Sequence, residues 1–156
     1  MSTEAGLVER FYAAFGRRDH RTMAAAYAPS ARFSDPVFTD LAGPRIGAMW
    51  RMLCERASDL RIACGPVTVA AGRARVEWQA WYTYTATGRP VHNRIQASLT
   101  IADGLITRHD DRFDLYRWSR QALGFKGVVL GWTPLVQGAI RKQAGKALER
   151  FERAAV

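Results

Sequence analysis

Apolar and polar residues alternate with a period of two over residues 60–116, more than a third of the chain. Successive side chains of a β-strand point to opposite faces of a sheet, so this pattern predicts strands. The predicted strands are residues 61–70, 75–85, 91–101 and 105–116, separated by turns at 71–73, 87–90 and 102–104. The last turn, Ala102-Asp103-Gly104, is typical of a tight hairpin. The segment is therefore expected to form consecutive antiparallel hairpins.

Three helices are predicted before these strands. Apolar residues recur at helical spacing over residues 7–15, and Asp19 can cap a short second helix that Pro29 ends. Pro44 is well placed to open a third helix. Its expected buried stripe is Ile46, Met49, Trp50, Leu53 and Ala57. Helices followed by hairpins predict an α+β fold, in which N-terminal helices cover one face of a curved antiparallel sheet, a cone-shaped half-barrel.

The 156 residues are enough for one domain with its own core. The two cysteines, Cys54 and Cys64, show neither a disulfide framework nor metal-site spacing. The N-terminal residues lack the basic and apolar regions of a secretory signal, so a cytoplasmic location with reduced thiols is expected.

The net charge of +9 is concentrated at the C-terminal end, where eight basic and two acidic residues follow from Arg117 onward. A basic tail is weaker evidence for nucleic-acid binding than a basic face interleaved with aromatic residues, so no nucleic-acid partner is expected. Residues 119–156 are interpreted as a basic amphipathic extension whose helix opens at Pro134. Its apolar stripe is Leu135, Ile140, Ala144, Ala147, Leu148 and Phe151. Two interpretations stay open: packing on the domain or a partner subunit, or contact with an anionic membrane.

A short strand over residues 31–33 runs into Asp35 and Pro36. Phe33 and Asp35 share a strand face, so an inward Phe33 implies an inward carboxylate. Such a group must be paired, protonated or used in chemistry. The alternative is an Asp-Pro turn with a solvated carboxylate.

Strand alternation brings further polar residues to the predicted inner face. Asn93 shares a side with Ile95 and Leu99, and His109 and Asp111 share a side with Phe113. Together with Asp35 these make four inward polar side chains. A purely apolar core usually holds fewer, so a pocket is predicted.

Residues 4–118 resemble the nuclear transport factor 2-like superfamily, which includes SnoaL-like polyketide cyclases, ketosteroid isomerases and limonene epoxide hydrolases. Residues 6–36 are similar to the opening of the isomerases, in which the Asp before Pro is the base that moves a proton α to a carbonyl. Residues 105–115 resemble the closing strand of the epoxide hydrolases, where the acid matching Asp111 is catalytic. The resemblance implies a SnoaL-like domain over residues 4–118.

The chain departs from both enzymes. Phe11 and Ala97 stand where the isomerases have the tyrosine and the protonated acid of the oxyanion hole, and neither side chain can donate a hydrogen bond. Trp78 and Ala80 stand where the epoxide hydrolases have an arginine and a second aspartate. Neither activity transfers intact.

These observations predict a site for a small apolar molecule, with acid–base chemistry by Asp35 together with Asp111 or His109 and no cofactor or metal. The expected ligand contacts are Phe11, Phe15, Phe33, Trp50, Trp78, Tyr82, Asn93, Ala97 and Phe113. The reaction class is isomerisation, cyclisation or hydration. The alternatives are a non-catalytic binding or accessory protein and a membrane-associated factor in lipid metabolism. A homodimer through the outer sheet face around Trp81 is also expected.

Overall fold

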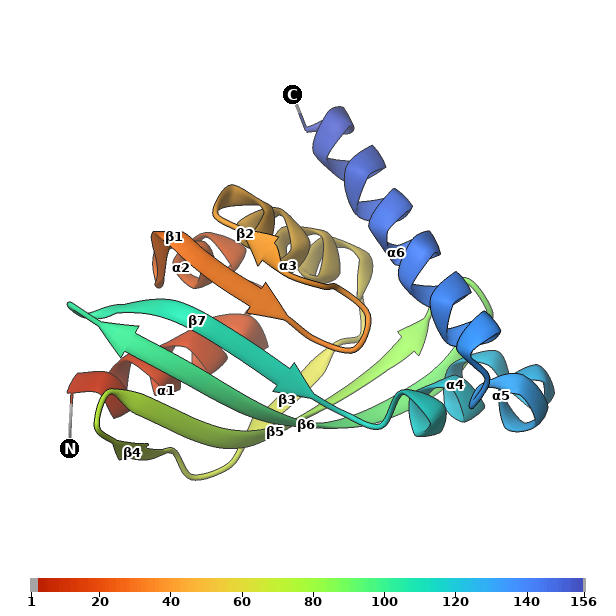
Figure 1. Ribbon diagram of the computed structural model, residues 1–156, viewed down its shortest axis with the longest axis horizontal. Coiled ribbons are helices and arrows are strands. Elements are labelled where there is room, and N and C mark those ends of the chain that lie inside the picture. The colour runs from red at the N-terminus through yellow and green to blue at the C-terminus, as the bar shows by residue number, and fades with distance from the viewer. Residues whose placement is uncertain (1–2, 156) are drawn as a thin grey trace.

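The computed structural model describes residues 3–155 and has the expected α+β architecture (Figure 1). The N-terminal helices are α1 (Thr3–Gly16), α2 (His20–Ala25) and α3 (Pro44–Arg56). The strands are β1 (Tyr27–Ser34), β2 (Leu41–Ala42), β3 (Arg61–Cys64), β4 (Thr68–Ala70), β5 (Arg73–Tyr84), β6 (Arg89–Ala102) and β7 (Leu105–Arg112). The C-terminal helices are α4 (Leu115–Leu123), α5 (Phe125–Leu130) and α6 (Pro134–Ala154).

Within the described residues the strands form one curved, unclosed seven-stranded sheet in the order β2-β1-β7-β6-β5-β3, with β4 also paired to β5. The long hairpins β5–β6 and β6–β7 are antiparallel as predicted. β1 differs, because it pairs with β7 in parallel, with Phe33 opposite His109. The pairing of strands this far apart in sequence is not visible in local patterns.

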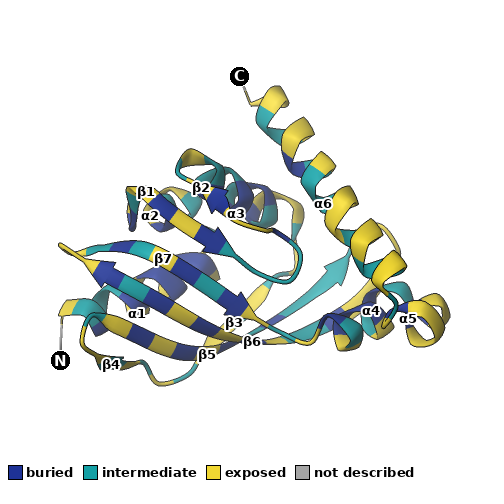
Figure 2. Ribbon diagram, in the orientation of Figure 1, coloured by how far each residue is buried: buried dark blue, intermediate teal, exposed yellow. Residues whose placement is uncertain are grey.

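The inner face of the sheet packs against α1 and α3 and forms the core. Buried and exposed residues alternate along β5 and β6, as Figure 2 shows by the banded strands. The alternation places Trp78 and Ile95 inward, as the sequence predicted. The parity of β7 is interrupted near its start, since a register shift follows Thr100 and buries Ile106 rather than Leu105.

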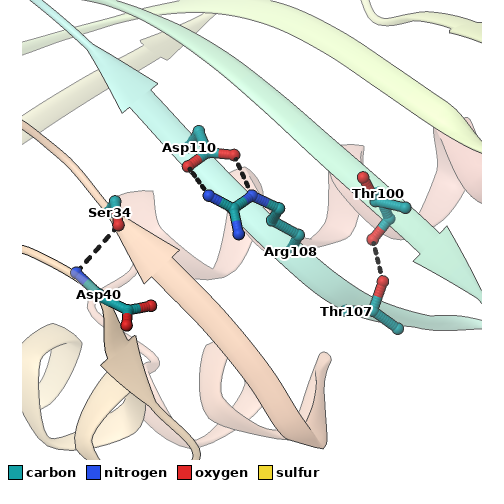
Figure 3. A network of polar contacts seen from close by, with 6 residues as sticks. All are labelled: Ser34, Asp40, Thr100, Thr107, Arg108 and Asp110. Carbon is teal, nitrogen blue, oxygen red and sulfur yellow. Dashed lines mark hydrogen bonds and ion pairs between the residues drawn. The ribbon is translucent and has the colours of Figure 1, made fainter.

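The outer face of β7 is polar. Arg108 Nε and Nη2 lie 2.8 and 3.2 Å from the two carboxylate oxygens of Asp110, a forked ion pair drawn in Figure 3. On the same face Thr107 donates to the carbonyl oxygen of Thr100, at 3.2 Å. Asp110 therefore turns outward, and its neighbour Asp111 turns inward.

The predicted end of the second helix is wrong. α2 ends at Ala25, and Tyr27 and Pro29 belong to β1. The register of β1 on β7 shifts between Tyr27 and Arg32, so Pro29 lies where the ladder is interrupted. Its lack of an N–H therefore removes no hydrogen bond from the ladder. Tyr27, which was predicted to be helical, is therefore a buried residue of the strand β1.

Two predicted strands also have different bounds. Residues 61–70 split into β3 and β4, because Pro66 has no N–H for the ladder, whereas the Gly65 N–H still donates to the Glu77 carbonyl oxygen at 2.8 Å. The last strand ends at Arg112 rather than Tyr116, because the Asp114 side chain accepts the Arg117 N–H at 3.0 Å and caps α4.

The C-terminal helices are joined to the domain rather than separate from it. The expected boundary between residues 118 and 119 falls inside α4, which packs against β6. Beyond the end of β7, the Gln121 side chain accepts from the His92 N–H and donates to its carbonyl oxygen, at 2.7 and 3.1 Å. α4 therefore completes the hydrogen bonds of a strand end that has lost its neighbour.

α6 lies beside α3 (Figure 1) and buries Leu148 completely. Most of its predicted apolar stripe packs on the core, but Leu135 does not and is exposed. The outer-face Trp81 is half-buried between the His92 ring, whose centroid is 4.6 Å away, and the Arg61 guanidinium, 4.9 Å from the Trp81 ring centroid. The homodimer through this face stays a prediction.

Candidate functional site

A cavity of about 370 Å³ opens between the inner face of the sheet, α3 and α6. Its wall is mostly apolar, and this wall includes residues that were not among the expected ligand contacts. Among them are Val37, Phe38, Met49, Met52, Leu53, Leu60, Ile95, Trp118 and Ile140. The volume suits a small molecule of one or two rings.

Most of the predicted site residues meet at this cavity. Those that line it are Phe15, Asp35, Trp50, Trp78, Tyr82, Asn93, Asp111 and Phe113. Both aspartates and Asn93 therefore lie on the inner side of the sheet, as strand parity predicts. His109 is completely buried and lies behind Asp111 rather than in the cavity wall.

Phe11, Phe33 and Ala97 do not line the cavity, contrary to the expectation that they contact a ligand. Phe11 and Phe33 pack edge-on against the His109 ring, with centroids 5.9 and 5.0 Å away. Ala97 is directly opposite Asp111 in the β6–β7 ladder and is also buried. All three surround the acidic site from the core side.

Asp35 holds a tight turn at the end of β1. Its Oδ1 accepts the backbone N–H groups of Val37 and Phe38, at 2.7 and 2.6 Å. None of the residues between 3 and 155 donates to Oδ2, and the side chain lines the cavity. The turn and the inward carboxylate, weighed as alternatives from the sequence, are both features of Asp35.

Burial raises the pKa of Asp35 to about 6, although the two backbone N–H groups act in the opposite direction. The charge of Asp111 raises this pKa further. Loss of water disfavours the ionised carboxylate, and the second acid in the same wall adds to the effect. The Asp35 carboxyl therefore exchanges its proton close to neutral pH.

Asp111 is backed by a chain of buried side chains. His109 Nε2 lies 2.9 Å from Asp111 Oδ1, and His109 Nδ1 lies 2.6 Å from the hydroxyl of Tyr27. The indole N–H of Trp50 donates to the same hydroxyl at 3.0 Å. Tyr27 is not among the predicted site residues, because Pro29 two residues later is also typical of a helix end.

The donors and acceptors determine the direction of each hydrogen bond in this series, from Trp50 through Tyr27 and His109 to Asp111. The Tyr27 oxygen already accepts from Trp50, and burial holds the pKa of its phenol well above its usual range, so it keeps its proton. The Tyr27 hydroxyl donates this proton to His109 Nδ1. Nδ1 is therefore the acceptor nitrogen of the ring, and Nε2 carries the ring N–H and donates it to Asp111. Asp111 Oδ1 is thereby an acceptor, and among the described residues no hydrogen bond reaches its Oδ2.

Within the described residues, two more polar side chains at the cavity are unpaired, Asn93 and Trp78, and a third, Tyr12, is unpaired behind Trp78. Asn93 lines the cavity, and its amide makes no hydrogen bond to any described residue. The Trp78 indole N–H and the Tyr12 hydroxyl are buried, again without a partner in residues 3–155. Buried donors usually have a hydrogen-bond partner. Unpaired donors next to a cavity are therefore groups to which a ligand or a water molecule can bind.

The mouth of the cavity is formed partly by the C-terminal extension. Ala144, Ala147, Gln143 and Arg150 of α6 line it, with Arg56 of α3. Arg150 is not part of the apolar stripe of this helix, yet it lies at the mouth. No carboxylate of the described residues lies within ion-pair distance of Arg56 or Arg150.

Specific contacts hold α6 over the cavity. Glu152 forms an ion pair with Arg45 of α3 at 3.1 Å. Arg141 donates to the carbonyl oxygen of Pro36, in the Asp35 turn, at 2.8 Å. Phe151 packs under the guanidinium groups of Arg51 and Arg56. The extension is therefore part of the site.

Residues 8–109 match the SnoaL-like domain, and the chain belongs to this family. No curated protein is a significant match. Solved structures with the same fold include an LEH-like epoxide hydrolase from M. tuberculosis, with a TM-score of 0.65 and 21% identity over 86% of this chain and 95% of that one. A putative SnoaL-like polyketide cyclase from Jannaschia Sp. CCS1 has a TM-score of 0.67 and 18% identity, over 78% and 92%.

A third similar structure is a hypothetical protein with a ketosteroid isomerase-like fold from Catenulispora acidiphila DSM 44928, in complex with trimethylamine. It has a TM-score of 0.68 and 15% identity, over 82% of this chain and 97% of that one. At these identities the likeness establishes the nuclear transport factor 2-like fold. Within residues 3–155, no group of three or more His, Cys, Asp and Glu side chains is arranged to hold a metal ion.

Proposed function

We propose that the cavity binds a small, largely apolar molecule and that Asp35 and Asp111 carry out acid–base chemistry on it. The observation that carries this proposal is the pair of carboxyl groups in one apolar wall. The Oδ2 atom of each carboxyl group accepts no hydrogen bond from a described residue. Nearby carboxyl groups titrate as a pair. When the pair holds one proton, the protonated group is an acid and the ionised group is a base.

In this proposal Asp35 is the base, because its raised pKa makes its carboxylate a stronger proton acceptor than an ordinary aspartate. Asp35 takes a proton from a carbon next to a carbonyl group of the ligand. When the proton shared by the pair lies on Oδ2 of Asp111, that group donates a hydrogen bond to the carbonyl oxygen, where charge develops. Asp35 then returns the proton at a second carbon, which completes an isomerisation. In a cyclisation, the enol carbon instead attacks a second carbonyl carbon of the same ligand, and the resulting alkoxide oxygen takes the proton from Asp35.

His109 and Tyr27 are positioning residues in this scheme. The His109 N–H fixes Oδ1 of Asp111, so Oδ2 is the atom presented to the ligand. Asn93 supplies an amide that can orient a carbonyl or hydroxyl group. Arg56 and Arg150, unpaired at the mouth, favour a ligand with a polar or acidic group at the end that faces α6.

The family and its structural neighbours support this choice of chemistry, since they include proteins described as polyketide cyclases and an epoxide hydrolase. Hydration of an epoxide is the remaining class, in which Asp35 would activate water and Asp111 would protonate the opening oxygen.

A non-catalytic binding or accessory role is the alternative. Phe11 and Ala97 favour it, because they provide no hydrogen bond at the positions of the isomerase oxyanion donors. The same cavity would then hold its ligand without turnover.

The proposal is tested by identifying the ligand and then searching for proton transfer. Native mass spectrometry of the purified protein detects a small molecule that copurifies with it. Bicyclic ketones such as 2-decalone in D₂O report base chemistry directly, because deuterium enters the α carbon even when no product forms. Epoxides in H₂¹⁸O report hydration. Ligand binding without deuterium or ¹⁸O incorporation by any compound would favour the binding protein over the enzyme.

A further inference from the structure

Residues 125–135, comprising α5, the following turn and the first turn of α6, form an exposed apolar tip. Phe125 and Leu135 are each 84% exposed and Trp132 is 64% exposed. Val128, Val129 and Leu130 are exposed as well. The large apolar side chains that are exposed in the described part of the chain all belong to this tip, which Figure 2 shows in yellow at one end of the molecule. Apolar patches of this kind mark binding surfaces.

The tip is an ordered part of the fold, and its apolar side chains cannot simply turn inward. The backbone of α5 packs directly on α4, since a Cβ added at Gly127 would lie 1.9 Å from the carbonyl oxygen of Ser119. Tyr116 donates its hydroxyl hydrogen to the Val128 carbonyl oxygen at 2.8 Å. The indole N–H of Trp132 is satisfied by the Val129 carbonyl oxygen at 3.0 Å. With its backbone against α4, α5 presents its side chains outward.

The charge around the tip has one sign. Residues 115–148 contain six basic residues and none of the 14 acidic residues of the chain. The basic residues are Arg117, Arg120, Lys126, Arg141, Lys142 and Lys146. An apolar tip bearing Trp and Phe and flanked by cations complements an anionic lipid surface, where aromatic rings lie at the headgroup level and basic side chains meet phosphates.

We propose that residues 125–135 dock the protein on the surface of an anionic phospholipid bilayer. The tip enters the interface without crossing it, and in residues 3–155 no helix has the length and apolar character needed to span a bilayer. Trp118 of α4 and Ile140 of α6, on either side of the tip, both line the cavity. Docking therefore brings the cavity close to the lipid phase, where apolar molecules concentrate.

A second copy of the chain is a poorer occupant of this surface. Pairing two tips would bring basic residues of both copies close together, with no acidic residue between residues 115 and 148 to offset them. Like charges across an interface are unfavourable, whereas an anionic bilayer neutralises them.

Vesicle flotation tests the proposal, with phosphatidylcholine vesicles compared with vesicles that also contain phosphatidylglycerol. The wild-type protein should float with the anionic vesicles at low salt and lose most of this binding at high salt. The double variant Phe125→Ser with Leu135→Ser should bind at least ~30-fold more weakly, because both side chains are exposed and the fold does not depend on them. Circular dichroism of this variant should match that of the wild type.

A pair of charge reversals supplies the matched control. Lys126→Glu, within the tip, should weaken binding about tenfold, since each basic residue near a charged membrane contributes about a factor of five and the reversal adds repulsion. Arg75→Glu makes the same change at an exposed position of β5, away from the tip, and should leave binding within about twofold of the wild type. Equal loss in the two variants, or no binding by the wild type, would overturn the proposal. Concentration-dependent self-association that disappears in the Phe125→Ser, Leu135→Ser variant, without vesicle binding, would assign the tip to a second copy instead.

Discussion

His109 Nε2 lies 2.9 Å from Oδ1 of Asp111, two residues further along the same strand. This contact joins the buried core to the cavity, because His109 is fully buried whereas Asp111 lines the cavity wall. The polar chain behind it ends at Tyr27 and Trp50 and is enclosed by aromatic rings. Packing of the core thus determines which oxygen of Asp111 faces a ligand.

Tyr27→Phe should lower the free energy of unfolding by roughly 2–4 kcal/mol, because it leaves His109 Nδ1 and the Trp50 indole N–H buried without a partner. Urea denaturation followed by circular dichroism measures this. Tyr84→Phe is the matched control: Tyr84 is half-buried, its hydroxyl bonds to no described residue, and the change should cost less than about 1 kcal/mol. An equal loss of unfolding free energy in the two variants would show that the buried hydrogen bonds of Tyr27 do not stabilise the fold.

Asp111→Asn and Asp110→Asn form a second matched pair, one inward and one outward on the same strand. Asp111→Asn keeps an oxygen for His109 but removes the acid, so turnover should fall by ~10²-fold or more. Asp110→Asn breaks only an exposed ion pair with Arg108 and should change stability by less than about 1 kcal/mol and turnover very little. Similar turnover in both variants would remove Asp111 from the chemistry.

The pH dependence of stability should reveal the buried carboxyl of Asp35. Its pKa is raised from 3.8 to about 6 on folding, so the folded state binds more protons than the unfolded state between these values. The free energy of unfolding therefore falls as pH rises through this window, by up to about 3 kcal/mol. Asp35→Asn keeps an oxygen for the Val37 and Phe38 N–H groups and should remove this loss.

Urea denaturation of wild type and Asp35→Asn at about pH 4 and about pH 8 measures the difference. The variant should gain stability relative to the wild type only at the higher pH. A variant that loses stability at the higher pH would mean that the ionised Asp35 stabilises the fold.

Ala147→Trp should block the cavity from α6 and weaken binding of an apolar fluorescent probe such as anilinonaphthalene sulfonate by about tenfold or more. Ala139→Trp adds the same side chain at an exposed position of the same helix and should leave probe binding unchanged. Isothermal or fluorescence titration distinguishes them, and unchanged binding in Ala147→Trp would mean that the probe binds elsewhere.

Sequence periodicity predicted the part of the site that lies on regular hairpins. Asn93 and Asp111 could be assigned to the inner face because β6 and β7 keep their alternation where these residues lie. Asp35 followed from Phe33 by the same rule. The SnoaL-like family and the α+β fold were also evident from the motifs and the order of elements.

Features that depend on contacts distant in sequence could not be predicted. Tyr27 reaches His109 only because β1 pairs in parallel with β7, which no local pattern indicates. Phe11 and Ala97 were assigned to the ligand by resemblance, but packing places them behind the cavity wall. The part played by Arg150 and Ala147 depends on how α6 docks on α3, and amphipathicity alone does not specify that partner.

The base role of Asp35 is tested most directly by the rate of deuterium incorporation into a bound ketone in D₂O, measured by NMR as a function of pH. For the wild type the rate should fall as pH rises above about 6, because the carboxyl pair then loses the proton that it shares. Asp35→Asn should bind the ketone with unchanged affinity but exchange at least ~10²-fold more slowly at every pH, whereas Asp40→Asn, at an exposed position, should match the wild type. An Asp35→Asn variant that exchanges as fast as the wild type, with the same pH profile, would contradict the assignment of Asp35 as the base.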